Sequence, residues 1–522
     1  MDTAEKKGFW GTVKAAFNAH PFCFLFVYGF LIMFFCTRSS PLYMFNGWVD
    51  ANAYFTMGKG LVNGLVPYRD LFDHKGPLLF LIYAVGYFID NDGFFGVYLI
   101  QSLFMFFILA FVYKTVLLFT PRKCPAFLLS LLFCTFFLQA SCYVDGGGSP
   151  DEFTLVFESI SLYFFCRYFL SGEKAHRPWV MFLHGAMAAC VLLLKFNLVL
   201  FWVGFGGVVF LKLLIQKQWK NFFQNLLFLF FGVAVVCVPY VIYAAYTNSL
   251  DDFIDVFFRF NMIYSRADES LFFKLFETAK RVLKYNIINI SACVMSLFGL
   301  LFLFLKKELW GHGWYLPFAA LASYGLSLFS VYFSTNTPPY TFLPNTIFTV
   351  LGLCVIGWYF SQWSARSVKG MNGILPAFVS AVLIFAVTLS ANGYIANSRL
   401  LPEGRRQAPQ RVFAEIINSY DNPTLLMYQS LDDGFYTAAN LLPSNRYFYK
   451  PSGTPYELYP YPMDEQNEIL REKKVQFVVC RTDHWSITHV DNEDLNRNYE
   501  LIAVSDKDLQ FELYYLLFQR KE

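Results

Sequence analysis

Long apolar runs, separated by short polar stretches, follow one another from Cys23 to Tyr394. The runs are roughly 17–26 residues long, and about 20 residues of helix are needed to cross a bilayer. The pattern predicts a multi-pass α-helical membrane protein with about eleven spans, within a range of eleven to thirteen. The predicted spans are 20–37, 94–119, 125–144, 151–170, 179–194, 198–215, 223–246, 286–305, 314–333, 339–360 and 374–395.

A further apolar stretch, 77–90, has only about 14 residues, which suits a helix at the membrane surface better than a span. The positive-inside rule supports this interpretation, because counting 77–90 as a span would reverse the side of every later loop. With eleven spans the N-terminus is cytoplasmic and the C-terminus lies outside. The cytoplasmic loops are then all basic: Arg122-Lys123, Lys174 to Arg177, Lys217 to Lys220, Lys306-Lys307 and Arg366 to Lys369.

Three larger segments are predicted on the outer face: a first loop at 38–93, an amphipathic second loop at 247–285, and a tail that begins near residue 400. The tail alternates helical patterns with strand-like runs, as small α/β domains do. The sequence predicts a membrane domain over 1–399 and an outer α/β domain over 400–522. The runs in the tail are strand-like at 424–428, 475–480, 499–504 and 511–518, and helical at 409–419 and 463–474.

Composition supports the membrane class and excludes others. Only 15% of the 522 residues are charged and 56% are hydrophobic, against about 25% charged in soluble domains. The net charge of +3 forms no basic stripe, so nucleic acid is not an expected partner. The eleven cysteines have neither zinc nor disulfide spacing and are interpreted as small buried hydrophobic residues. We expect the first apolar run to be an uncleaved span, because no small-residue cleavage site follows it.

The first outer loop holds the densest group of polar residues in the membrane part. Asp50 opens a predicted short helix, where an acid also suits the N-terminus electrostatically. Lys75 precedes the surface helix, where it could reach the head groups or bind the phosphate of a lipid ligand. The residues alone do not decide whether Asp50 has a structural or a functional role, or which of its two roles Lys75 has. The group comprises Asp50, Asn52, Tyr54, Lys59, Arg69, Asp70, Asp73, His74 and Lys75.

A second group of ionisable residues lies at predicted span ends. Asp151 and Glu158 are seven residues apart, two helical turns, and so share one face. Glu158 should lie about 10 Å below the start of its span. Because ionisable residues at membrane depth usually face a wet cavity or a partner, Asp151, Glu152, Glu158 and Lys195 suggest an outward-open cavity. Pairing of Lys195 with Glu158 for packing alone is the alternative.

The order of motifs in the first loop resembles the GT-C glycosyltransferases of the family 39 type, which include protein O-mannosyltransferases and lipid A aminoarabinose transferases. The resemblance is carried by Asp50 to Tyr54, Gly60 to Gly64, Pro67 to Asp70 and Asp73 to Pro77. It extends more weakly to Asp145, Asp151, Glu152, Lys195 and the step from Tyr340 to Pro344. The chain departs from the pattern at Ala51 and His74, where relatives often have acids, and at Gly76 before the proline.

The resemblance implies a transferase in the plasma (inner) membrane that inverts the sugar's anomeric carbon. The chain lacks a glycine fingerprint for nucleotide sugars, so the expected donor is a polyprenyl-phosphate sugar. The acceptor is a glycan, lipid or protein of the cell envelope. Asp50 would be the general base, while Lys75, Lys195 and Arg69 would bind the donor phosphate. Residues expected to orient substrate are Asn52, Tyr54, Asp73, His74, Asp151, Glu152, Glu158 and Tyr340.

No metal site and no cofactor are assigned, although a divalent metal is left open; His74 is favoured as a hydrogen-bond partner over a lone metal ligand. An O-antigen ligase or polymerase would share the outline, but its major outer loop is expected in the second half of the chain. A lipid-linked sugar transporter should show internal repeats, and none is seen.

Overall fold

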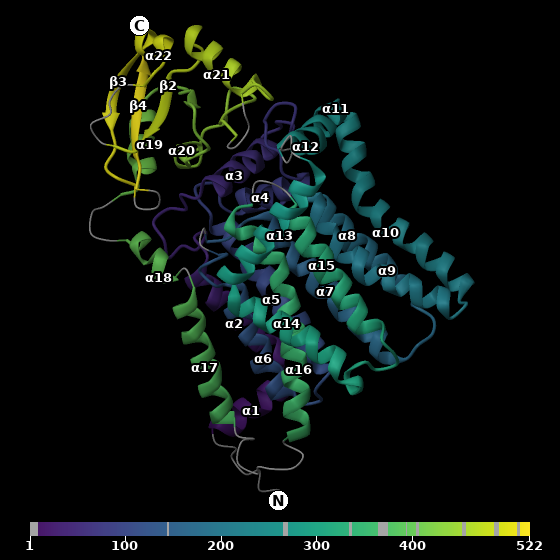
Figure 1. Ribbon diagram of the computed structural model, residues 1–522. Helices are drawn as coiled ribbons and strands as arrows, with labels where there is room; N and C mark the ends of the chain where they lie inside the picture. Colours follow the sequence, from purple (N-terminus) through teal and green to yellow (C-terminus); the bar gives the residue numbers. More distant parts are fainter. Residues whose placement is uncertain are drawn as a thin grey trace, which may run out of the picture.

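The computed structural model describes residues 9–143, 146–264, 270–333, 337–363, 374–392, 394–402, 407–451, 456–484, 490–508 and 512–522. Three sequence features fall outside these ranges: the predicted basic loop Arg366 to Lys369, Asp145 of the resemblance, and Arg266 of the second outer loop. The molecule has two parts, a helical bundle and a tail domain over 407–522 that caps one end of it (Figure 1).

The helices of the bundle follow the predicted apolar runs, since each run buries part of its surface against neighbouring helices. They are α1 (Phe9–Ala19), α2 (Pro21–Cys36), α5 (Phe95–Leu117), α6 (Lys123–Phe137), α7 (Pro150–Ser171), α8 (Pro178–Leu192), α9 (Leu200–Ile215), α10 (Trp219–Tyr246), α14 (Ile290–Leu305), α15 (Tyr315–Tyr332), α16 (Thr349–Trp363) and α17 (Ile374–Ala391).

Shorter elements connect these helices, most of them at the end that carries the tail domain (Figure 1). The α-helices among them are α3 (Val49–Val62), α4 (Pro77–Ile89), α11 (Leu250–Phe253), α12 (Asn261–Tyr264), α13 (Leu271–Ile288) and α18 (Tyr394–Asn397). A π-helical segment, η2 (Ile254–Phe260), and four 3-10 segments, η1 (Phe196–Val199), η3 (Lys307–Leu309), η4 (Pro339–Phe348) and η5 (Ser398–Leu400), complete the set.

Every predicted span coincides with an apolar helix, but the helices differ in length. Within the described residues, seven helices are long and apolar enough to cross a membrane, or up to nine if two bent pairs each count as one span. The predicted spans at α6 and α8 have 15 residues each, fewer than the about 20 that a crossing needs. The count of eleven therefore stays a prediction. The 13-residue α4 is also too short, as expected for a surface helix.

Two of the differences between predicted spans and observed helices have a clear structural cause. The span predicted over 125–144 ends as a helix at Phe137, because the next residues turn to pair with the end of α17, where the Ala140 N–H donates to the Ala391 carbonyl. The span predicted from residue 286 begins at Ile290, after a 104° bend between α13 and α14. Asn289 lies at this bend, where its Oδ1 accepts a hydrogen bond from Ser141.

The tail domain confirms the predicted alternation of strands and helices. Its sheet has the order β1-β2-β4-β3, with β1 parallel to β2 and the other pairs antiparallel. Some apolar residues of β2 and β4 belong to the same buried cluster as the bundle, and the others are buried within the tail domain. The elements are α19 (Pro409–Ile417), β1 (Leu425–Met427), α20 (Phe435–Ala438), α21 (Tyr461–Arg471), β2 (Phe477–Thr482), α22 (Glu493–Asn498), β3 (Tyr499–Val504) and β4 (Tyr514–Arg520).

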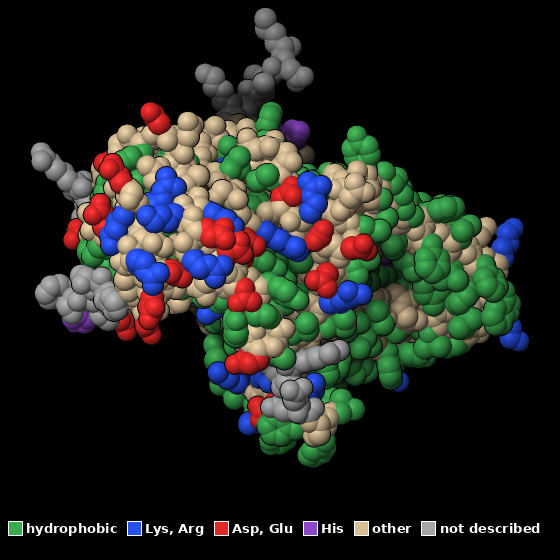
Figure 2. Space-filling model, turned by 90° about the horizontal axis from the view of Figure 1, so that it is seen from above, with side chains coloured by type: hydrophobic (Ala, Val, Ile, Leu, Met, Phe, Trp, Pro, Cys, Tyr) green, Lys and Arg blue, Asp and Glu red, His purple; other side chains and the backbone are tan. Residues whose placement is uncertain are grey.

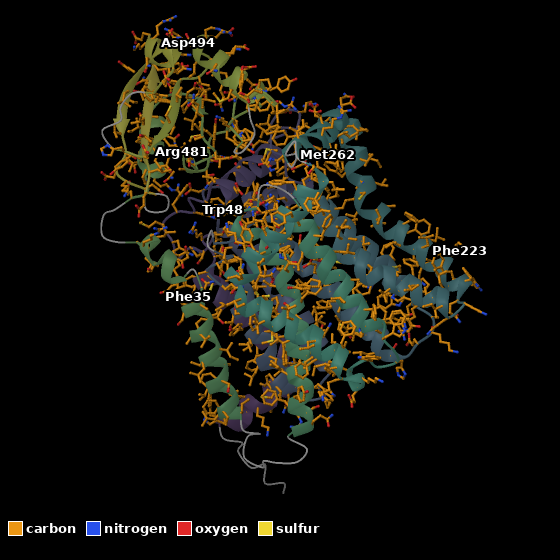
Figure 3. The ribbon with its side chains drawn as sticks, in the orientation of Figure 1. Phe35, Trp48, Phe223, Met262, Arg481 and Asp494 are labelled. Atoms are coloured by element: carbon orange, nitrogen blue, oxygen red, sulfur yellow. The ribbon has the colours of Figure 1, made fainter. Side chains whose placement is uncertain are left out.

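Surface character separates the two parts. Figure 2 shows charged side chains of both signs over the tail domain on the left, whereas apolar side chains cover the arm on the right, where α10 lies. Phe223 stands at the far edge of α10 in Figure 3 and is 61% exposed. Such a surface fits contact with lipid rather than water. Trp48, in contrast, lies buried near the junction of the two parts.

Buried polar contacts join the tail domain to α3. Lys59 of α3 donates to the carbonyl oxygens of Tyr436 (2.7 Å) and Leu441 (2.9 Å). Thr56 donates to Asp432 at 2.7 Å. Burial lowers the pKa of Lys59 to about 7. Since buried polar groups without partners are costly, these contacts fix the tail domain in one position over the first loop.

Asp433 should make the stability of this junction depend on pH. Burial raises its pKa from 3.8 to about 7, and Arg481, 3.6 Å away, only partly opposes this. The stabilising contribution of the neutral carboxyl is complete below pH 4 and is lost as the pH rises through 7. We expect thermal unfolding between pH 4 and 8 to show a decline in the wild type of up to about 4 kcal/mol relative to Asp433→Asn. Parallel pH profiles would contradict this.

Candidate active site

A cavity of about 210 Å³ lies where the first loop meets the turn after α8, the segment around α12 and the chain entering α16. Four residues predicted as site residues line it, namely His74, Lys75, Lys195 and Tyr340. Further polar lining comes from Asn197, Asn261, Ser330 and Thr341, and an apolar wall from Leu194, Phe196, Phe257, Val331, Phe333 and Pro338.

The two lysines reach the same cavity because their backbones are joined directly. The Gly76 N–H donates to the Leu194 carbonyl at 3.1 Å, and the Leu78 N–H to that of Leu193 at 3.1 Å. A Cβ on Gly76 would lie 2.0 Å from the Leu193 carbonyl oxygen. Only glycine permits this approach, which explains the glycine before Pro77 that departs from the family pattern.

Lys195 forms an ion pair with Asp151 at the start of α7. Its Nζ lies 2.9 Å from Oδ1 and 3.0 Å from Oδ2 of a carboxylate that is fully buried. The predicted alternative, a pair between Lys195 and Glu158, is therefore not what the structure contains. Because part of the Lys195 side chain stays exposed in the cavity, the ammonium can bind Asp151 and still face a ligand.

Asp50 lies near the same cavity through its contact with Tyr340. The Tyr340 hydroxyl donates to Oδ2 of Asp50 at 2.9 Å. Asp50 is half-buried in the first turn of α3, as the predicted short helix placed it, but Trp48 rather than Asp50 is the N-cap residue. The carboxylate has a second oxygen beyond this bond, so it retains lone pairs that can accept a proton from a hydroxyl group.

Asp73, His74 and Lys75 form a connected unit. Asp73 accepts hydrogen bonds from the Lys75 N–H (2.8 Å) and from the hydroxyl of Tyr449 in the tail domain (3.0 Å). Burial raises the pKa of Asp73 to about 6. Burial also lowers the pKa of His74 well below its usual value. The ring is therefore neutral, and its Nε2 accepts from the Lys75 ammonium at 2.6 Å.

The charges around Lys75 act on one another. Burial lowers the pKa of Lys75, and the positive charge of Lys195 acts in the same direction. The carboxylates of Asp50, Asp73 and Asp151 oppose this shift. The five groups thus form a single electrostatic unit, in which an anion entering the cavity would favour the charged form of Lys75.

Eight predicted site residues are not part of the cavity lining. Asp50, Asp73 and Asp151 contact residues that line it, whereas the other five lie elsewhere. Arg69 is bound on the surface by Asp70 and the Thr247 carbonyl. Asn52 donates to the backbone at Asn46 and Trp48, and Tyr54 packs between Trp48 and Tyr83. Glu152 accepts from Gln101, Tyr143 and the Gly148 N–H. Glu158 is buried in α7, and its Oε2 has no hydrogen-bond partner among the described residues.

Several residues of the site gave no signal in the sequence. Asn197 and Asn261 donate to the carbonyl oxygens of Ser330 and His74 across the cavity, each at 2.8 Å. Asn261 follows the π-helical segment η2, a type of irregularity that often lies at functional sites. Tyr449 lies 376 residues from Asp73, and no local pattern links them.

The described residues contain no group of three or more His, Cys, Asp or Glu side chains that could hold a metal ion. All eleven cysteines are free thiols. The carboxylates near the cavity are each paired with a lysine, a tyrosine or a backbone N–H instead.

A family model for the putative competence-induced protein Ccs4 N-terminal domain matches residues 13–366, a range that includes every cavity residue. The chain belongs to this Ccs4 family. No curated protein matches its sequence.

Solved structures identify the fold of this Ccs4 family member. ArnT from Cupriavidus metallidurans, bound to undecaprenyl phosphate or in the apo state, aligns with a TM-score of 0.60 and 12% identity over 96% of this chain and 98% of that chain. The Archaeoglobus fulgidus oligosaccharyltransferase aligns with a TM-score of 0.44 and 12% identity over 87% of this chain and 67% of that chain. The chain is thus a multi-pass membrane protein with the GT-C fold, as the sequence predicted.

The bond from Tyr449 gives a first prediction for the site. Tyr449→Phe removes one hydrogen bond to the buried Asp73 and leaves the ring in place. Since a bond to a charged group contributes about 1.5–3 kcal/mol, we expect the affinity of the cavity for its ligand to fall about tenfold or more. Tyr447→Phe, which removes a bond to Tyr459, is the matched control. Equal losses in both variants would assign the effect to the domain's stability.

Proposed function

We propose that the protein is a glycosyltransferase that moves a sugar from a polyprenyl-phosphate donor to a hydroxyl group of a cell-envelope acceptor on the outer face of the plasma membrane. Four observations support the proposal: the GT-C fold, two lysines in one cavity, a carboxylate at its edge and an apolar wall beside them. The solved ArnT structure with undecaprenyl phosphate is an example of a related fold that binds this class of lipid.

In the proposed reaction Asp50 accepts the proton of the acceptor hydroxyl as its oxygen attacks the anomeric carbon. The new bond joins this oxygen to the carbon, and the bond from the carbon to the phosphate oxygen breaks with inversion. The electron pair leaves with the phosphate, where Lys75 and Lys195 stabilise the developing negative charge. Tyr340 holds the Asp50 carboxylate in position through its 2.9 Å hydrogen bond.

The single observation that carries the proposal is the convergence of Lys75 and Lys195. They come from separate loops, yet Gly76 packs against Leu193 so that both line one cavity. Two cations beside an apolar wall fit an amphiphilic anion whose charge is a phosphate and whose remainder is hydrocarbon.

The test is release of undecaprenyl phosphate by the purified full chain in detergent, incubated with a panel of undecaprenyl-phosphate sugars and a cell-envelope extract. We expect Lys75→Met to lower turnover about 100-fold or more, in the range found when one stabilising donor is removed. Arg69→Gln, predicted from the sequence to bind phosphate but located outside the cavity, should stay within about threefold of the wild type.

Two outcomes would contradict the proposal. Unchanged release in Lys75→Met, with the thermal unfolding curve unaltered, would remove the lysine from the reaction. The second outcome is that no donor releases undecaprenyl phosphate, while the protein moves the same lipids across the membrane of liposomes. This result would favour a lipid-linked sugar transporter.

A further inference from the structure

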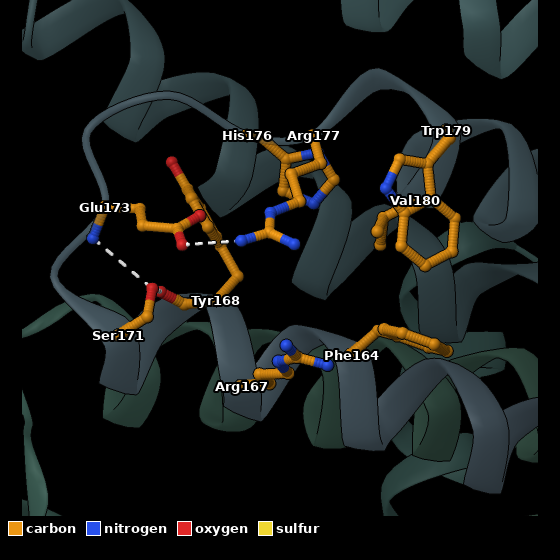
Figure 4. A pocket seen from close by; sticks show the side chains of 9 residues that line it. All are labelled: Phe164, Arg167, Tyr168, Ser171, Glu173, His176, Arg177, Trp179 and Val180. Atoms are coloured by element: carbon orange, nitrogen blue, oxygen red, sulfur yellow. Dashed lines mark hydrogen bonds and ion pairs between the residues drawn. The ribbon is translucent and has the colours of Figure 1, made fainter.

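A second, smaller pocket lies at the other end of the bundle, where α7 ends and α8 begins (Figure 4). Its volume is about 40 Å³, enough for about three water molecules or one compact polar group. The helix α7 runs from Asp151 at the candidate active site to Ser171 at this pocket, so the two sites lie at opposite ends of one helix. The loop over 172–177 belongs to the predicted cytoplasmic side.

Two guanidinium groups face each other across this pocket. Figure 4 shows Arg167 on one side and Arg177 on the other, with Glu173 beside Arg177. Arg177 pairs with Glu173 at 3.1 Å, and both side chains are half exposed, so this bond is readily exchanged. Arg167 makes no hydrogen bond or ion pair within the part of the chain that the structure describes. Arg167 is exposed, so its positive charge is available to a ligand at the pocket.

His176 supplies a hydrogen-bond acceptor, whereas the two arginines supply donors. It is 2% exposed and lines the pocket, and its Nδ1 lies 2.7 Å from Oδ1 of Asn225. An amide oxygen can only accept, so Nδ1 carries the proton. Burial lowers the pKa of His176 to about 4, so the ring is neutral and Nε2 is an acceptor. Nε2 is itself buried and has no hydrogen-bond partner among the described residues, so a hydroxyl group that enters between the lining side chains would satisfy it.

Aromatic side chains place the pocket at a membrane surface. Trp179 is 52% exposed, and its ring packs edge-on against Phe164 at 5.7 Å. Tryptophan is enriched where lipid head groups meet the hydrocarbon layer. The neighbouring α10, which packs along α8, exposes Phe223 and other apolar side chains. A ligand with its head in the pocket could therefore lay an acyl chain along these helices.

We propose that this pocket binds the head group of an anionic phospholipid that carries a phosphodiester and a free hydroxyl, as phosphatidylglycerol does, in the cytoplasmic leaflet. Arg167 and Arg177 bind the phosphate, and His176 accepts from the hydroxyl. The N-terminus of α8, a 15-residue helix, adds a favourable dipole for the anion. An ethanolamine head group fits less well, because its ammonium would approach two guanidinium groups.

The test is native mass spectrometry of the full chain in detergent, titrated with dioleoyl phosphatidylglycerol and, separately, dioleoyl phosphatidylcholine. The double variant Arg167→Gln/Arg177→Gln should bind phosphatidylglycerol on the order of 30-fold more weakly, since each basic residue contributes about fivefold. The control Arg122→Gln/Lys220→Gln removes two charges from the same predicted face outside the pocket and should bind as the wild type does. Equal binding by both double variants would overturn the proposal.

Two further arms identify the ligand. The wild type should prefer phosphatidylglycerol over phosphatidylmethanol, which has the same phosphodiester without a hydroxyl, and His176→Phe should lose this preference while its unfolding temperature confirms that it folds. No preference in the wild type would overturn the role of the hydroxyl. Displacement of the lipid by millimolar inorganic phosphate would identify a soluble phosphate as the ligand and overturn a lipid site. None of these readouts depends on sugar transfer.

Discussion

Asp50→Asn is expected to lower kcat for sugar transfer by about 10²–10⁴-fold, the range that general-base catalysis supplies. The asparagine keeps the size of the side chain, and its carbonyl oxygen can still accept the hydrogen bond from Tyr340. What it loses is the ability to take a proton. We therefore expect the KM for the donor and the unfolding temperature to stay close to wild type while turnover falls. Release of undecaprenyl phosphate under saturating donor is the measurement.

Tyr340→Phe separates catalysis from positioning at this carboxylate. It removes the hydrogen bond to Asp50 and leaves the carboxylate itself, so we expect a loss of only about tenfold. An Asp50→Asn variant with wild-type kcat would end the assignment of Asp50 as the base. A Tyr340→Phe loss as large as that of Asp50→Asn would instead assign the proton transfer to the pair.

Lys195→Met is expected to destabilise the protein by about 3–5 kcal/mol as well as to abolish transfer. The Asp151 carboxylate is fully buried, and Lys195 contacts both of its oxygens. Removing one partner of a buried ion pair leaves an uncompensated charge, which is the origin of so large an effect. Thermal or denaturant unfolding in detergent, beside the transfer assay, measures the two losses.

The double variant Lys195→Met/Asp151→Asn distinguishes a structural pair from a functional one. It removes both charges, so most of the lost stability should return, whereas transfer should not. Recovered transfer in the double variant would show that the ion pair serves packing alone. A single Lys195→Met variant as stable as the wild type would contradict the pairing.

Much of the fold could be predicted from the sequence, because helices and strands leave local patterns of apolar and polar residues. Apolar runs and basic loops predicted the helices, and the four strand-like runs of the tail match β1 to β4. The lengths of α6 and α14 were less predictable, since backbone contacts with distant segments end α6 at Phe137 and Asn289 lies at a bend before α14. Such contacts leave no periodicity in the apolar pattern.

The site was predictable to the extent that its residues follow one another in the first loop. Lys75 and its neighbour His74 reach the cavity, as does Lys195. Arg69 does not line the cavity, because its guanidinium group binds the adjacent Asp70. The partner of a charged side chain was harder to predict where more than one residue could pair with it. Lys195 pairs with Asp151 rather than with Glu158. The helical face shared by Asp151 and Glu158 does not reveal which one the lysine contacts.

The bond between Asp73 and Tyr449 has a consequence for the timing of biosynthesis. The two residues are 376 positions apart, and a ribosome adds about 5–20 residues per second, so Tyr449 is made about 20–75 seconds after Asp73. By the end of that interval the membrane helices and both cavity lysines have been made, but Asp73 still lacks the hydroxyl that binds it. A later-made part of the chain therefore completes an earlier-made loop, and a chain released before Tyr449 would have an unfinished site.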